Sequence, residues 1–294
     1  MTDIENSKKA VVLAKDMGIG NRIMFLFSCL RIFKPQDFTL YWPAEGWVTM
    51  KFFDLFKFDW DYPVTENNEI IKERNINLPA PLCFTEGWRL YIDKNDGLPQ
   101  FFQKEYLDPP HGYGIDLEYN RIPENIKDIY RPYFKRLHPS DAVAKRIEDV
   151  TLPENAVAVY MTNDTNWKEL KVNNRNIEIK KYFKAMDKHP KDTVFFVSYR
   201  NPDTIKPFVD RYKDRIITLP HKDCKLMTDA VADLFIMSKC KEMILPYEST
   251  FCCLAWWIGG ANAAVTIVKQ KQSIGKIIRK FIKRRKIRKN VIET

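Results

Sequence analysis

Glycines, an asparagine and an arginine follow the first apolar segment of the chain, in the order Gly18-Ile19-Gly20-Asn21-Arg22. Backbone N–H groups at the start of a helix carry a partial positive charge and bind phosphate, and glycines let a phosphate approach them closely. The spacing does not complete the G-x-G-x-x-G pattern of dinucleotide-binding loops. The same residues are as typical of a tight turn in which Asn21 caps the helix, so both interpretations remain open.

A second group of polar residues stands between an apolar strand and an apolar helix near the C-terminus. Ser249, Thr250 and Phe251 follow the strand sequence EMILPY, and Asp233 lies on the helix before that strand. Hydroxyl and amide groups at this helix start are suited to a diphosphate. Alternatively, Ser249 or Thr250 only caps the helix.

A third loop carries five consecutive polar residues after the strand sequence AVAVYM. Asp164, in the middle of the loop, is a candidate general base for an acceptor hydroxyl. The loop is equally typical of an ordinary polar turn. Its members are Thr162, Asn163, Asp164, Thr165 and Asn166.

Two other patterns give little support for a metal. Asp59-Trp60-Asp61 matches a D-x-D diphosphate–metal motif, but this short pattern arises often by chance and no clear strand precedes it. The four histidines are scattered along the chain and do not have ligand spacing. We therefore expect no metal site.

The elements that must position these loops alternate between strand and helix. An apolar strand, a glycine loop and a helix bearing Ile23, Phe27 and Leu30 are followed by the strand FTLYWP. After residue 150, five strand-like segments alternate with four helix-like ones, and Ser140 is predicted to cap the helix before them. We expect an α/β fold of two Rossmann-like halves with a cleft between them, comprising residues 1–145 and 146–268, and ligands at the carboxyl ends of the strands.

The net charge of +10 is concentrated in the tail. Residues 269–289 contain 11 Lys or Arg and no acid, whereas the body of the chain is neutral. Isoleucines and Phe281 recur there at helical spacing, so residues 269–294 are predicted to form a basic amphipathic segment that binds an anionic membrane surface. A neutral body argues against a nucleic-acid partner.

The N-terminus has no apolar signal segment, and the six cysteines form no C-x-x-C pair, which together favour the cytoplasm. Residues 249–268 contain no charge and are long enough to span a bilayer. A glycine pair and Asn262 divide them, however, into a helix, a turn and a strand. We therefore expect a protein associated peripherally with the inner face of a membrane.

The sequences GIGNRI, YWP, FFDLF and DLFIMSKCKEMILPYESTFCCLAWWIGG, in this order, resemble the fucosyltransferase-like group of GT-B glycosyltransferases. The resemblance extends from Val11 to Val268, and the order of the motifs is its most specific part. It implies an inverting, metal-independent transfer of fucose or a related sugar from a GDP-linked donor, without a further cofactor. The acceptor is expected to be a surface polysaccharide or a lipid-linked saccharide.

The resemblance assigns roles to individual residues. The loop of Gly18, Gly20, Asn21 and Arg22 is similar to the one that faces the donor diphosphate. Asp233 resembles the acid of the donor-side helix, and the three residues Ser249, Thr250 and Phe251 resemble the S-[ST]-F donor contacts. Catalysis is expected to depend on Arg22 and Asp164.

The chain departs from the family at one motif, His-x-Arg-Arg, whose arginine neutralises the leaving diphosphate. Tyr160, Thr162 and Asn163 stand at the matching positions. Another cation must then lie near the diphosphate, and the candidates are Arg22, Arg175 and Arg200. The alternative is a catalytically inactive relative that binds a glycan or a nucleotide.

Overall fold

The computed structural model describes residues 9–12, 18–32, 38–58, 64–66, 124–161, 177–246 and 249–269. In the N-terminal part, three parallel strands form a sheet in the order β1-β2-β4, and helix α1 connects the first two. This arrangement is the parallel crossover predicted from the sequence. The elements are β1 (Lys9–Val12), α1 (Ile19–Ile32), β2 (Phe38–Tyr41), α2 (Phe52–Leu55), β3 (Phe56–Phe58) and β4 (Val64–Thr65).

Two helices and a short strand lead from there into the C-terminal part. Strand β5 pairs with β3 in antiparallel fashion, which the sequence did not predict. Ser140 caps the following helix, as predicted, because its hydroxyl accepts a hydrogen bond from the Val143 N–H at 3.3 Å. The elements are α5 (Glu124–Lys135), β5 (Leu137–Pro139) and α6 (Asp141–Glu148).

The C-terminal part is a parallel five-stranded sheet in the order β10-β9-β6-β7-β8. All residues of β6 and β7 are buried, as expected of a parallel sheet covered on both faces. Helices α7 and α8 pack on one face, and α9 and α10 pack on the other. The elements are β6 (Val157–Met161), α7 (Ile179–Met186), β7 (Phe195–Tyr199), α8 (Lys206–Tyr212), β8 (Ile216–Ile217), α9 (Met227–Ser238), β9 (Glu242–Pro246), α10 (Thr250–Ile258) and β10 (Ala264–Val268).

The order of this sheet reverses between β6 and β9. From β6 the chain first adds β7 and β8 on one side, then crosses over and adds β9 and β10 on the other. In open parallel sheets, a crevice forms outside the carboxyl ends of the two strands where the order reverses, and ligands bind there. The polar loops after β6 and β9 were predicted to carry chemistry, and they begin at this point.

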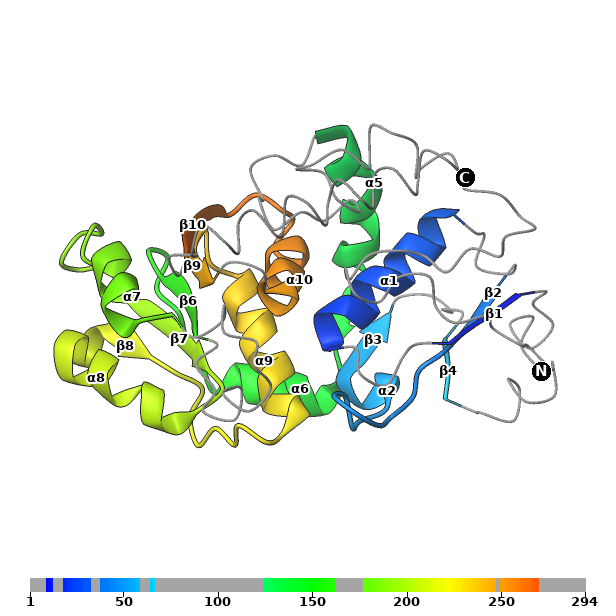
Figure 1. The fold of residues 1–294 in the computed structure, drawn as a ribbon, viewed down its shortest axis with the longest axis horizontal. Coiled ribbons are helices and arrows are strands. Elements are labelled where there is room, and N and C mark those ends of the chain that lie inside the picture. The colour runs from blue at the N-terminus through cyan, green and yellow to red at the C-terminus, as the bar shows by residue number, and fades with distance from the viewer. Residues whose placement is uncertain are drawn as a thin grey trace, which may run out of the picture.

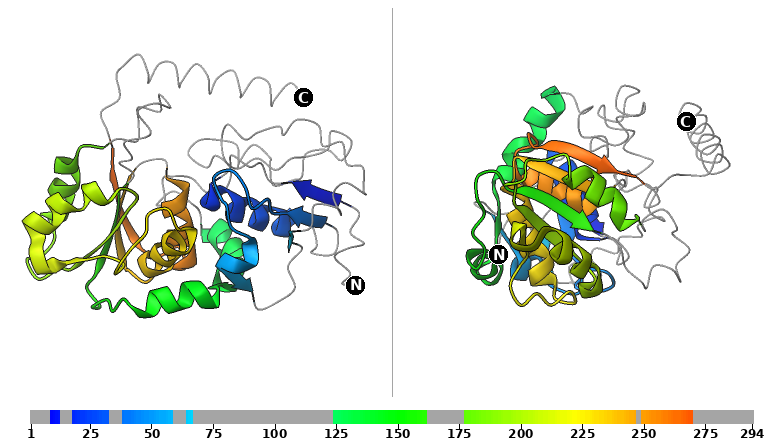
Figure 2. Two further views of the ribbon diagram at one scale, coloured as in Figure 1. Left: turned by 90° about the horizontal axis from the view of Figure 1, so that it is seen from below. Right: turned by 90° about the vertical axis from the view of Figure 1, so that its left-hand side faces the viewer.

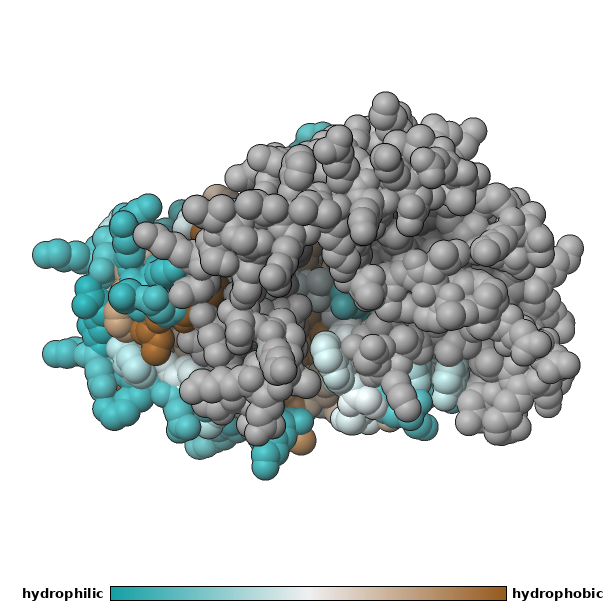
Figure 3. All heavy atoms as spheres, in the orientation of Figure 1, coloured by the Kyte–Doolittle hydropathy of each residue, from teal (hydrophilic) through white to brown (hydrophobic). Residues whose placement is uncertain are grey.

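Helices α9 and α10 lie between the five-stranded sheet and helix α1 (Figures 1 and 2). One hydrophobic core extends through these layers, because Phe134 of α5 stacks on Trp257 of α10 at 5.1 Å and meets Phe27 of α1 at 4.5 Å. The predicted boundary at residue 145 falls within α6. A second core lies under α7 and α8, whose outer surface is hydrophilic (Figure 3).

Several predictions are confirmed or corrected by these elements. Residues 249–268 divide into α10, a turn at Gly259–Gly260 and β10, and no helix among the described residues is long and apolar enough to cross a membrane. Asn21 does not cap α1, because the helix begins at Ile19 and places Asn21 in its first turn. The cysteines on α10 and Cys240 are buried free thiols, as expected. The basic tail beyond residue 269 lies outside the described residues.

Candidate functional site

The first turns of α1 and α10 are in direct contact. A Cβ atom at Gly20 would overlap the Thr250 carbonyl and lie 2.9 Å from the backbone nitrogen of Phe251, so only glycine allows this approach. Gly18 has more space, since its nearest neighbour would be the Trp47 ring at 3.7 Å. Gly20 therefore serves helix packing, and the two helix N-termini that were predicted to face one cleft lie side by side.

Helix α10 begins at the point where the order of the sheet reverses. The Ser249 hydroxyl accepts a hydrogen bond from the Cys252 N–H at 3.4 Å, so Ser249 caps the helix, as one of the two interpretations proposed. The Phe251 ring stacks on Tyr160 near the carboxyl end of β6, with centroids 4.9 Å apart. Phe251 thereby connects the strands on both sides of the crevice.

A row of side chains continues from Tyr160 to helix α9. Tyr160 and Ser198 are register partners in neighbouring strands, and both lie one residue before the end of their strand. The Ser198 hydroxyl donates a hydrogen bond to Oδ2 of Asp233. The row Asp233, Ser198, Tyr160, Phe251 and Thr250 thus runs along the carboxyl edge of the sheet and reaches α1 at its end.

The Asp233 carboxylate is buried, and only one of its two oxygens has hydrogen-bond partners. Its side chain is 1% exposed, and Oδ2 also accepts from Nζ of Lys222, whose side chain is 4% exposed. Oδ1 is buried without a hydrogen-bond partner. Burial raises the pKa of Asp233, while the Lys222 ammonium and the Ser198 hydroxyl act to lower it.

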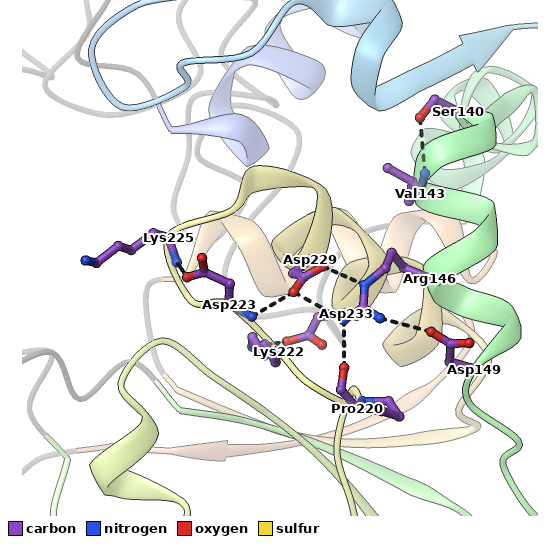
Figure 4. Close-up of polar contacts among 10 residues, drawn as sticks. All are labelled: Ser140, Val143, Arg146, Asp149, Pro220, Lys222, Asp223, Lys225, Asp229 and Asp233. Atoms are coloured by element: carbon purple, nitrogen blue, oxygen red, sulfur yellow. Dashed lines mark hydrogen bonds and ion pairs between the residues drawn. The ribbon is translucent and has the colours of Figure 1, made fainter.

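A second buried carboxylate fixes the loop that carries Lys222 (Figure 4). Asp229 receives Nε of Arg146 at 2.8 Å and the backbone N–H of Asp223 at 2.8 Å. Arg146 also donates to the Pro220 carbonyl at 2.7 Å. The loop between β8 and α9 is therefore bound to α9 through Lys222 and Asp223, and to α6 through Pro220.

Arg22 is predicted to face a diphosphate, and the described contacts of its side chain lie within the protein. Its side chain is completely buried, and its guanidinium donates to the backbone carbonyls of Pro43 and of Glu45, the latter at 3.1 Å. The guanidinium carbon also lies 5.2 Å from the centre of the Trp42 ring. These contacts connect α1 to the turn after β2 and give Arg22 a structural role, and the catalytic role predicted for it stays a prediction.

Of the other predicted residues, some lie in the described part of the chain and the rest lie outside it. The side chain of Asn21 keeps a buried Oδ1 without a partner, and Arg200 is exposed directly after β7. No group of three or more His, Cys, Asp or Glu that would suit a metal occurs in the described part of the chain. The remaining candidates lie outside that part, namely Asp59, Asp61, Thr162, Asn163, Asp164, Thr165, Asn166 and Arg175.

Lys222 and Ser198 belong to the site but were not predicted from the sequence. No motif marks them, because their importance depends on Asp233, which is distant from Ser198 in the chain. Ser198 was placed in a strand, and its position near the carboxyl end of that strand was the available signal.

The chain resembles known proteins in its fold and not in its sequence. The sequence matches no protein-family model and no curated protein. Among solved structures, the fucosyltransferase NodZ from Bradyrhizobium has a TM-score of 0.51 at 14% identity, over 85% of this chain and 92% of NodZ. POFUT1 in complex with GDP has a TM-score of 0.51 at 15% identity, over 90% of this chain and 99% of POFUT1.

A third structure agrees with these two. The R284K mutant of Arabidopsis thaliana FUT1 in complex with GDP has a TM-score of 0.52 at 14% identity, over 91% of this chain and 71% of that chain. The chain has the fucosyltransferase fold. The α/β architecture predicted from the alternation of strands and helices is thereby confirmed, and in this fold the site described above lies at the reversal point of the C-terminal sheet.

Proposed function

We propose that the protein is a glycosyltransferase that uses a GDP-linked sugar, fucose or a close relative, and binds it across the carboxyl edge of the five-stranded sheet. The observation that carries the proposal is the fucosyltransferase fold over most of the chain, together with a row of side chains at the reversal point. The proposal includes the GT-B arrangement of two Rossmann-like halves around the donor site.

The row offers complementary chemistry for the two ends of such a donor. The adjoining N-termini of α1 and α10 carry partial positive charge suited to the diphosphate. Oδ1 of Asp233 is an acceptor without a partner, and the N1–H and N2–H groups of guanine are donors. Structures of NodZ soaked with GDP-fucose and of POFUT1 with GDP are the neighbours that support this nucleotide.

We expect GDP to bind more tightly than UDP, CDP or ADP in calorimetry, since uracil offers a single N–H on the corresponding edge. GDP should also raise the melting temperature, because it binds only the folded state. The absence of heat with all four nucleotides would contradict the donor site. Equal affinity for all four would contradict base recognition by Asp233.

The proposed reaction is an inverting, metal-independent substitution at C1 of the donor sugar. The acceptor oxygen forms a bond to C1 while the bond from C1 to the diphosphate oxygen breaks, and GDP leaves. Asp164 accepts the proton of the acceptor hydroxyl as general base. Helix N-termini and a nearby cation stabilise the charge on the departing diphosphate.

The acceptor is proposed to be a surface polysaccharide or a lipid-linked saccharide, at the cytoplasmic face of a membrane. The support is the basic tail, because each Lys or Arg near an anionic surface contributes about 1 kcal/mol to binding. The full-length protein should sediment with phosphatidylserine vesicles at low salt and dissociate as salt is raised, whereas a chain ending at Val268 should remain in solution. Equal sedimentation of both proteins would contradict the role of the tail.

A second candidate function is an inactive relative that binds a nucleotide or a glycan. The observation in its favour is the missing arginine at Thr162 and Asn163, together with the structural contacts of Arg22. GDP release from GDP-fucose in the presence of acceptor saccharides separates the two functions. Binding of GDP without any release of GDP would favour the inactive relative.

A further inference from the structure

Lys222 is a buried cation whose hydrogen bonds all remain within the protein. Its ammonium donates to Oδ2 of Asp233 and to the Tyr199 carbonyl, and it lies 4.4 Å from the centre of the Tyr199 ring. An ammonium has three N–H donors, and the carboxylate, the carbonyl and the ring face account for them. Lys222 is therefore not placed to bind a ligand directly.

The ion pair of Lys222 and Asp233 is not explained by a gain in folding stability. Removing two charges from water costs several kcal/mol per ion, and apolar side chains of similar volume are often at least as stabilising. The pair also leaves Oδ1 of Asp233 buried and unpaired, although buried polar atoms in proteins are nearly always hydrogen-bonded. Both features indicate that the carboxylate is arranged for a partner outside the protein.

The positions of the two oxygens follow from the groups that hold them. Ser198 and Lys222 both donate to Oδ2, so the carboxylate cannot rotate without losing two hydrogen bonds. Lys222 itself is fixed because its loop is bound through Pro220 and Asp223 to Arg146 and Asp229 (Figure 4). The orientation of Oδ1 is thus determined before any ligand arrives.

We propose that Lys222 is a positioning residue for the donor site: it holds the Asp233 carboxylate ionised, with Oδ2 occupied and Oδ1 directed to the N–H groups of the donor base. The proposal rests on the donor site proposed above. It adds a residue that touches the donor only through Asp233, and it assigns recognition of the base to the pair of Lys222 and Asp233.

Loss of Lys222 should change the protonation of Asp233. Lys222 is the principal group that lowers the pKa of this carboxyl against the effect of burial. Without it, the carboxyl binds a proton at higher pH and no longer presents a charged acceptor. Among the described residues, the ionisable or polar groups that interact with Asp233 are Lys222 and Cys224 of the loop, Ser198 and Tyr199 of β7, and Asp229 of α9.

The test is calorimetry of GDP binding to full-length Lys222→Met, with Lys225→Met as the matched control. Lys225 lies in the same loop and is exposed, so its replacement should leave the affinity unchanged. Lys222→Met should bind GDP about tenfold to a hundredfold more weakly, as expected for a lost hydrogen bond to a charged acceptor. In turnover assays, the KM for the donor should rise more than kcat falls.

The pH profile distinguishes positioning from a general loss of structure. For Lys222→Met, GDP affinity should recover as the pH is raised, because the carboxyl ionises again. The wild-type affinity should vary less with pH. A variant that merely distorts the site would remain weak at every pH.

If Lys222→Met does not fold, a double variant is used to test the proposal. Lys222→Met with Asp233→Asn removes both charges, so it should fold, and it should bind GDP weakly at every pH. Wild-type affinity in Lys222→Met or in the double variant would overturn the proposal while leaving the donor site intact. Absence of nucleotide binding by the wild type would instead overturn the donor site, and this proposal with it.

Discussion

Replacing Arg22 by methionine is expected to lower the free energy of unfolding by about 3 kcal/mol. The side chain is completely buried, and its removal leaves the Pro43 carbonyl, also buried, without this donor. A hydrogen bond to Glu45 at 3.1 Å and the stacking of the guanidinium on Trp42 at 5.2 Å are lost as well. Methionine fills much of the volume but replaces none of these contacts.

Urea denaturation followed by circular dichroism measures this change, with Arg200→Met as the control. Arg200 is exposed, so its replacement should alter the free energy of unfolding by no more than about 0.5 kcal/mol. The result contrary to expectation is an Arg22→Met protein of normal stability with strongly reduced turnover. That result would support the catalytic role that the sequence predicts for Arg22.

The contacts of Arg22 have a consequence for the donor site. They connect the first turn of α1 to the turn that follows β2, and that same turn of α1 packs on Thr250 through Gly20. Arg22 therefore helps to fix the position of α1 against α10. Its replacement is expected to disturb the adjoining helix N-termini indirectly, even though the side chain is buried away from solvent.

Much of the fold could be predicted because its strands are short apolar segments separated by amphipathic helices. The sequences VAVYM and FFVSY are buried on both faces in the middle of a parallel sheet, which is the environment that such segments favour. Strand β5 could not be predicted in this way. It has three residues, Leu137–Pro139, and it exists because a distant strand, Phe56–Phe58, pairs with it.

The candidate site was predicted in part. Strand-to-helix loops at Gly18 and Ser249 were recognised, since topology alone places such loops at the edge of the sheet. The direction of a side chain cannot be obtained from that pattern, and Arg22 points into the protein for this reason. Lys222 was missed because its hydrogen-bond partners among the described residues are Asp233 and Tyr199, and tertiary structure alone brings them together.

The proposed transfer requires a cation that stabilises the leaving diphosphate. The resemblance requires a cation after β6, where this chain has Thr162 and Asn163. Met161, at the end of β6, is the register partner of Tyr199 in β7, so Arg200 leaves the sheet at the level where β6 ends. Neighbouring strands are about 4.8 Å apart, a distance that an arginine side chain can bridge. Arg200, one of the three candidates to replace the missing arginine, is thus exposed and lies next to the proposed donor site.

Replacing Arg200 by methionine is therefore expected to lower kcat about a hundredfold to a thousandfold, the usual loss when a group that stabilises developing charge is removed. GDP affinity should fall much less, because the charge on the diphosphate grows as the bond to C1 breaks. Turnover of GDP-fucose with an acceptor measures the effect, and Lys225→Met serves as a control for the loss of one exposed cation. Normal kcat in Arg200→Met would exclude Arg200 as the replacement for the missing arginine.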